Sequence, residues 1–239
     1  MTRTTNARIA GFTFLFYIAI GILSMVLFNP AAGVEGIAAK LAAIAEHATE
    51  VRIGICLNLL MSFSALVLAV TLYRITRDVD PDLAMLGLTC RVGESVIGAI
   101  FMFADLGLLW LGTATGANAP DAAAAHALGA FFFKVGGWSP TIGAIFFAVG
   151  STIFSWLLLR GRIVPVAMAW LGVLASALLV VLLPGQLAGF IKGPVLDFMW
   201  LPALVFEVTL ALWLLIKGVA LPLNGQASRT PQDCRDERK

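Results

Sequence analysis

Charged residues are scarce in this chain of 239 residues: they make up only 13% of it, against about 25% in an ordinary soluble domain. Apolar residues make up 60%. A soluble fold of this size could neither bury so much apolar surface nor cover it with so few charges. The composition therefore excludes a soluble enzyme, a nucleic-acid-binding protein and a disordered chain, and it predicts a polytopic membrane protein.

Histidine and cysteine are also rare. The two histidines, His47 and His126, lie in predicted loops, so a haem or zinc ion held by histidines inside the membrane is not expected. Cys56 and Cys90 lie in apolar stretches and Cys234 in a polar one, and no pair has the spacing of metal ligands or of a disulfide framework. Glycine patterns typical of nucleotide binding are missing too. We therefore expect no metal site and no cofactor.

Six segments are long and apolar enough to cross a bilayer, which takes about 20 residues. They cover residues 9–28, 51–73, 83–111, 139–159, 163–183 and 200–219. We expect an all-α protein whose single domain, residues 1–223, is a bundle of six transmembrane helices. Residues 224–239 are polar and contain proline, glycine and serine, which predicts a disordered tail.

The distribution of Lys and Arg predicts the orientation of the bundle. The segment before the first span, the second and fourth loops and the C-terminal end together hold eleven of these residues, whereas the opposite side holds four. Positive residues accumulate on the cytoplasmic side of a membrane protein. Both termini, and with them the tail, are therefore predicted to be cytoplasmic.

Two segments on the predicted outer side have helical patterns. Ile37, Leu41, Ile44 and Ala48 recur at helical spacing, which predicts a short helix on the outer surface. Residues 121–135 form either a similar helix or an extension of the fourth span. The three glycines between residues 185 and 193 follow a proline and favour a loop or a re-entrant turn.

The third span carries three ionisable residues, although a charge at the centre of a membrane helix costs about 2.5–3.5 kcal/mol on insertion scales. Arg91, Glu94 and Asp105 share one face of that helix at about 100° per residue. Arg91 and Glu94 are three residues apart and are expected to pair. Asp105 lies about 21 Å further along the axis, near the outer boundary, so it carries less weight.

Glu207 lies near the middle of the sixth span, where no residue of its own helix could neutralise it. Either it is protonated or it shares Arg91 with Glu94. We favour sharing, because Glu94 and Glu207 lie within about 7 Å of each other in depth at 1.5 Å per residue. Asn58 and Tyr17 could add hydrogen bonds. The sequence therefore predicts a buried cluster of Arg91, Glu94 and Glu207, with Asn58 and Tyr17 around it.

The predicted cluster has three interpretations. Polar side chains can simply hold helices together in lipid. Intramembrane charges are also typical of transport and proton coupling, although no predicted span is broken by Gly or Pro near its middle. Catalysis is the third possibility. Ser95 follows Glu94 in the sequence Gly-Glu-Ser-Val, which lacks the second glycine of a hydrolase nucleophile elbow, and no span supplies a histidine base. Ser95 is therefore interpreted as a packing residue.

Several short motifs resemble one known family of bacterial membrane proteins. They are RIAG at 8–11, GICLNL at 54–59, LA at 83–84, RVGE at 91–94, LRGRIVP at 159–165, WLG at 170–172 and LWLLIKGV at 212–219. Together they resemble the family catalogued as domain of unknown function 4386, over nearly the whole stretch from residue 8 to 219. The resemblance implies six helices in the inner membrane of a bacterium and no assigned activity, so no catalytic residue is carried over. The matching motifs include Arg91, Glu94 and Asn58.

Three functions remain open from the sequence. The first is a small permease or proton-linked transporter that uses the cluster as its site. The second is a non-catalytic accessory or structural subunit, and the third is an intramembrane enzyme that acts on a lipid or isoprenoid. The expected surroundings are the lipid bilayer and a lipophilic or other small-molecule ligand, with no nucleic acid.

Overall fold

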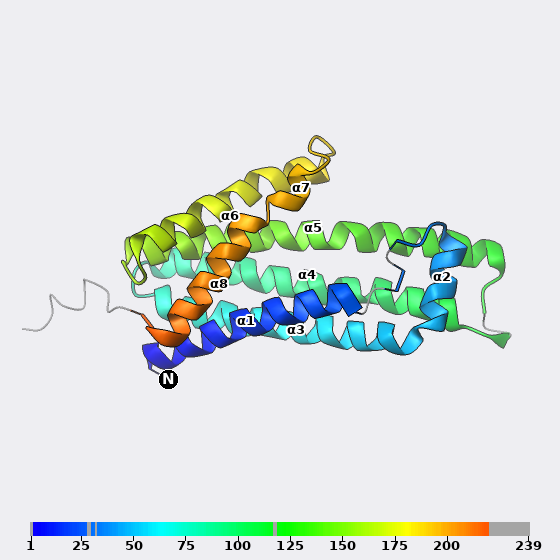
Figure 1. The fold of residues 1–239 in the computed structure, drawn as a ribbon, viewed down its shortest axis with the longest axis horizontal. Coiled ribbons are helices and arrows are strands. Elements are labelled where there is room, and N and C mark those ends of the chain that lie inside the picture. The colour runs from blue at the N-terminus through cyan, green and yellow to red at the C-terminus, as the bar shows by residue number, and fades with distance from the viewer. Residues whose placement is uncertain (1, 28–29, 32, 117–118, 220–239) are drawn as a thin grey trace, which may run out of the picture.

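A computed structural model describes residues 2–27, 30–31, 33–116 and 119–219 of the chain (Figure 1). The predicted disordered tail, residues 224–239, lies outside this range. The regular elements in the described residues are all helices: α1 (Arg3–Leu27), α2 (Ile37–Glu46), α3 (Ala48–Thr76), α4 (Pro81–Thr113), α5 (Ala122–Arg160), α6 (Val166–Leu187), α7 (Val195–Phe198) and α8 (Leu201–Ile216). The all-α class is confirmed.

Five of these helices, α1, α3, α4, α5 and α6, are long and apolar enough to cross a membrane. The sixth predicted span is shorter than expected, because α8 has only 16 residues and measures about 24 Å at 1.5 Å per residue. That is less than the hydrocarbon thickness of about 30 Å. Pro202 fixes its first turn, and Gly218, at a φ of 72°, follows its C-terminal end. The described chain is thus a multi-span membrane protein with five candidate spans and one shorter apolar helix.

The two helical patterns outside the spans are both present as helices. The short helix forms as α2, whose Leu41 and Ile44 are buried against the end of α4. Of the two alternatives for residues 121–135, the structure adopts the extension, because α5 runs without interruption from Ala122 through Pro140 to Arg160. Asp121 caps the N-terminus of α5 by accepting a hydrogen bond from the backbone N–H of Ala124.

The long helices form a ring that follows the order of the chain. Each of α1, α3, α4, α5, α6 and α8 packs against the next, and α8 closes the ring by packing against α1 (Figure 1). Short connections between antiparallel neighbours favour this arrangement. One end of the ring, here called the Arg160 end, holds the start of α1 and the ion pair of 2.9 Å between Arg160 and Asp80. The other, the α2 end, is crossed by α2.

The main apolar core fills the half of the ring nearer the Arg160 end. It comprises side chains of α1, α3, α4, α5, α6 and α8, among them Leu68, Leu72, Phe154, Phe206 and Leu210. The helices approach closely here: a Cβ added at Gly11 would lie 2.6 Å from the carbonyl oxygen of Ala211. This half of the ring is therefore solid. The cavity described below lies nearer the α2 end, where two smaller apolar clusters also pack.

The outside of the ring is apolar as well. Large side chains such as Phe12, Phe103 and Val181 are each more than 60% exposed. In water an apolar surface of this extent would drive aggregation, whereas in a bilayer it contacts acyl chains. The exposed surface therefore agrees with membrane residence.

Candidate functional site: a cavity beside a buried ion pair

Arg91 and Glu94 form a buried ion pair on α4. The Nη1 atom of Arg91 lies 2.8 Å from Oε2 of Glu94, and the two side chains are 1% and 11% exposed. The pair spans one turn of one helix, as their spacing of three residues predicts. Such a pair lowers the cost of placing two charges in an apolar interior, although it seldom stabilises the fold in net terms.

Helix α5 accommodates the Arg91 side chain. A Cβ added at Gly150 would lie 3.0 Å from Cγ of Arg91, so the absence of a side chain there leaves room for the arginine stem. The guanidinium carbon lies 4.7 Å from the centre of the Phe147 ring, which is the geometry of a cation–π interaction. The hydroxyl of Ser95 donates to the carbonyl of Arg91 at 3.1 Å. Ser95 is therefore engaged with its own helix, as expected for a packing residue.

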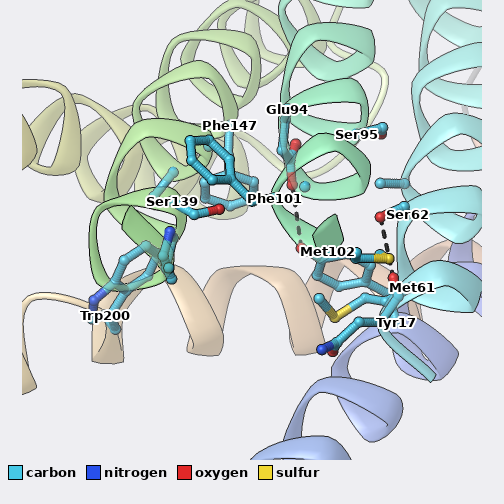
Figure 2. Close-up of a pocket in the computed structure, with 18 of the residues that line it drawn as sticks. Tyr17, Met61, Ser62, Glu94, Ser95, Phe101, Met102, Ser139, Phe147 and Trp200 are labelled. Atoms are coloured by element: carbon cyan, nitrogen blue, oxygen red, sulfur yellow. Dashed lines mark hydrogen bonds between the residues drawn. The ribbon is translucent and has the colours of Figure 1, made fainter. Parts of the chain in front are cut away.

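Tyr17 of α1 contacts the ion pair from across the ring. Its hydroxyl donates a hydrogen bond of 3.2 Å to Oε1 of Glu94, and Figure 2 shows this bond. Glu94 is thus held from two sides, by Arg91 on its own helix and by Tyr17 on α1. This contact joins two helices that are not neighbours in the ring.

Asn58 of α3 does not bond to the ion pair. Its Oδ1 atom accepts a hydrogen bond of 3.0 Å from the hydroxyl of Ser24 on α1, and its carbonyl accepts one of 3.1 Å from Ser62. The Asn58 side chain nevertheless lines the same cavity as Glu94. The expected hydrogen bond from Asn58 to the cluster is replaced by a link between α1 and α3.

Glu207 of α8 lies at this cavity too, but it does not pair with Arg91. Within the described residues, the ion pair of Arg91 is with Glu94, and Glu207 has no hydrogen bond or ion pair. The expected sharing of the Arg91 guanidinium between Glu94 and Glu207 is therefore not seen as a direct ion pair. The reason lies in packing: α8 contacts α1 and α6 in the ring and faces α4 across the cavity.

The cavity has a volume of about 710 Å³, within the range of about 300–1,000 Å³ that is usual for small-molecule sites. Residues of α1, α3, α4, α5 and α8 line it, together with Trp200 directly before α8. Arg91 lies behind Glu94 and does not line the cavity. The other predicted site residues do line it: Tyr17, Asn58, Glu94, Ser95, Asp105 and Glu207. From Glu94 to Asp105 it extends about 16 Å along α4 at 1.5 Å per residue.

The cavity ends where the apolar core begins. Ala65 and Ala203 line the cavity, and Leu68 and Phe206, one turn further along α3 and α8, belong to the core. The same holds on α5, where Phe147 lines the cavity and Phe154 is buried in the core. The solid half of the ring therefore separates the cavity from the Arg160 end.

The sequence did not single out the aromatic and sulfur-containing wall of the cavity. Phe101, Phe147 and Trp200 contribute rings, and Met61 and Met102 contribute thioethers; all five are labelled in Figure 2. The nearest sequence signal is the group of small or helix-bending residues in α5 between Gly136 and Gly143, which also lines the cavity. Aromatic residues are so common in membrane helices that their pattern alone does not distinguish a cavity wall from a lipid-facing surface.

The apolar helical ring and its buried ion pair together define a multi-span membrane protein. A family model described as Domain of unknown function (DUF4386) matches residues 9–218, and the chain belongs to this family. No curated protein matches the chain, and no solved structure matches it.

Proposed function

We propose that the protein is a small permease, linked to proton movement, that binds its substrate in the cavity. The observation that carries the proposal is the position of two carboxyl groups, Glu94 and Glu207, in the wall of one cavity inside the ring. Intramembrane carboxyl groups that face a cavity are typical of ion and proton pathways. A purely structural role explains Glu94, which is paired, but it gives no reason for Glu207.

The shape of the cavity supports a carrier rather than a channel. The apolar core closes it toward the Arg160 end, which we predict to be cytoplasmic. A carrier in this state would be closed toward the cytoplasm. Transport would then require the core half to open while the half nearer α2 closes, as in alternating access.

Glu207 is the proposed proton carrier. Its carboxyl group faces the cavity and has no partner in the part of the chain that the structure describes, whereas Glu94 is held by Arg91 and Tyr17. A proton on Glu207 would neutralise a carboxyl group that faces the cavity and forms no ion pair within the described residues. Its protonation is therefore expected to change which of the two states is favoured.

Cysteine accessibility tests alternating access without knowledge of the substrate. Ser62→Cys places a thiol in the cavity wall at almost no change in volume, in a chain whose native cysteines are replaced by alanine. A charged, membrane-impermeant methanethiosulfonate is applied to right-side-out and inside-out vesicles. We expect modification from both faces. Modification from one face alone, or from neither, would contradict a carrier and favour an accessory subunit.

Two further variants complete the test. Ser155→Cys is the matched control, because Ser155 is 1% exposed in the core half and should react only from the predicted cytoplasmic side. In Ser62→Cys, we expect the ratio of cytoplasmic to outer labelling to depend on pH. Glu207→Gln should remove this dependence. Glu46→Gln changes an exposed acid on α2 and should preserve it. An unchanged dependence in Glu207→Gln would contradict the proton link.

A further inference from the structure

We infer that the cavity binds a lipophilic cation, whose positive group lies at Glu207 and whose apolar body lies against the aromatic and thioether wall. This inference rests on the proposed function, since it names the substrate class of the same site. It begins from the charges of the wall. Glu94, Asp105 and Glu207 line the cavity, and among the lining residues described there is no lysine, arginine or histidine.

The nearby cation, Arg91, is not available to bind a ligand. Arg91 lies behind Glu94, is 1% exposed and forms its ion pair with that residue. It therefore compensates the charge of Glu94 but presents no positive surface to the cavity. The carboxyl of Glu207 is left as the charge in the middle of the ring that a ligand would neutralise. Every charged side chain that an anionic ligand would meet in the described wall is acidic.

Several polar groups of the wall are already engaged in hydrogen bonds within the protein. Ser62 donates to the carbonyl of Asn58, and Ser95 donates to that of Arg91. The Asn58 side chain accepts from Ser24. A substrate with many hydroxyl groups would lose its bonds to water here and find few partners in exchange, which costs free energy for each unpaired group. The site therefore disfavours sugars and similar neutral polar molecules.

The remaining wall suits an apolar body with a delocalised or shielded positive charge. The Phe147 and Trp200 rings lie 6.4 Å apart, centre to centre, and Phe101 lines the same cavity. Aromatic faces attract cations, most strongly where water is excluded. Met61 and Met102 add flexible, polarisable side chains that adapt to ligands of different shape.

Two probes of nearly the same shape and opposite charge test the inference. Tetraphenylphosphonium is a lipophilic cation and tetraphenylborate is the corresponding anion. Each is titrated against the purified full chain in detergent by equilibrium dialysis, with protein-free micelles as the baseline. We expect saturable binding of one tetraphenylphosphonium per chain and no saturable binding of tetraphenylborate. No saturable binding of the cation, or equal binding of the anion, would overturn the inference.

Three variants locate the binding. Glu207→Gln should weaken tetraphenylphosphonium binding by about tenfold or more, because it removes the carboxyl charge that attracts the cation in a site of low dielectric constant. Trp200→Leu, at the start of α8, should weaken it through the loss of a ring and provides a second test if Glu207→Gln fails to fold. Glu46→Gln should bind as the wild type does. Wild-type affinity in both cavity variants would place the cation elsewhere and overturn the inference.

The two proposals can fail separately. Dialysis measures binding without a membrane, and cysteine labelling measures access without a ligand. Cation binding together with one-sided labelling of Ser62→Cys would preserve the cation site and refute the permease. Two-sided labelling without cation binding would preserve the permease and refute the substrate class.

Discussion

Replacement of Glu94 by methionine should strongly destabilise the protein. The substitution retains an apolar side chain of similar length but removes the counter-ion of Arg91. Arg91 is 1% exposed, so its positive charge stays buried in the variant. Glu207 makes no ion pair with it in the described structure. The variant therefore leaves a charge in an apolar interior without a direct partner.

The distance between the two groups sets the magnitude. Opposite unit charges 2.8 Å apart attract each other by about 6 kcal/mol at an effective dielectric constant of about 20. Desolvation of both groups offsets part of this attraction, and removal of one partner of a buried pair typically costs about 3–5 kcal/mol. We expect a loss of that size in the free energy of unfolding, which raises the unfolding equilibrium constant by about a hundredfold or more.

Titration with sodium dodecyl sulfate, followed by helical circular dichroism in mixed micelles, measures the effect. The double variant Arg91→Met/Glu94→Met should recover most of the lost stability, because it removes both charges at once. Arg160→Met is the matched control: it breaks the ion pair with Asp80, in which the Arg160 side chain is 54% exposed, and should cost at most about 1 kcal/mol. Equal losses in the Glu94 variant and the double variant would refute the reasoning.

Two further variants test the contacts of α1 by the same titration. Gly11→Ala places a Cβ 2.6 Å from a backbone carbonyl oxygen of α8, so it should force α1 and α8 apart and destabilise the fold by about 1–3 kcal/mol; an unchanged stability would contradict this close approach. Tyr17→Phe removes the hydrogen bond of 3.2 Å to Glu94 and should cost about 1 kcal/mol. A combined Tyr17→Phe/Glu94→Met variant that shows fully additive losses would indicate that the two side chains do not interact.

Local patterns were sufficient to predict the Arg91–Glu94 pair. Residues three positions apart on a helix are neighbours wherever the helix lies, so the contact followed once the third span was recognised. Helix α2 was predictable for the same reason, since its buried residues recur at helical spacing. The end of α8 was harder to place, because the apolar run continues to Val219 while the helix ends at Ile216.

The position of Glu207 could not be predicted from depth alone. Equal depth in two helices places two groups in one layer of the membrane, but their distance depends on where each helix lies in the ring and how it is rotated. The structure places α8 between α1 and α6, so Glu207 faces α4 across the cavity instead of contacting Arg91. The cavity wall was likewise unpredictable, since it combines residues from five helices.

Composition and periodicity by themselves determined that the chain is an all-helical membrane protein with a charged pair in its third span. Both features depend only on residues that are near one another in the sequence, so they need no knowledge of long-range contacts. Only the tertiary structure decided that the ring is solid near the Arg160 end and holds a cavity nearer the α2 end, that Tyr17 holds Glu94 from across the ring, and that Glu207 faces the cavity. A cavity is the space that packed helices leave between them, so it exists only once all of them are in place.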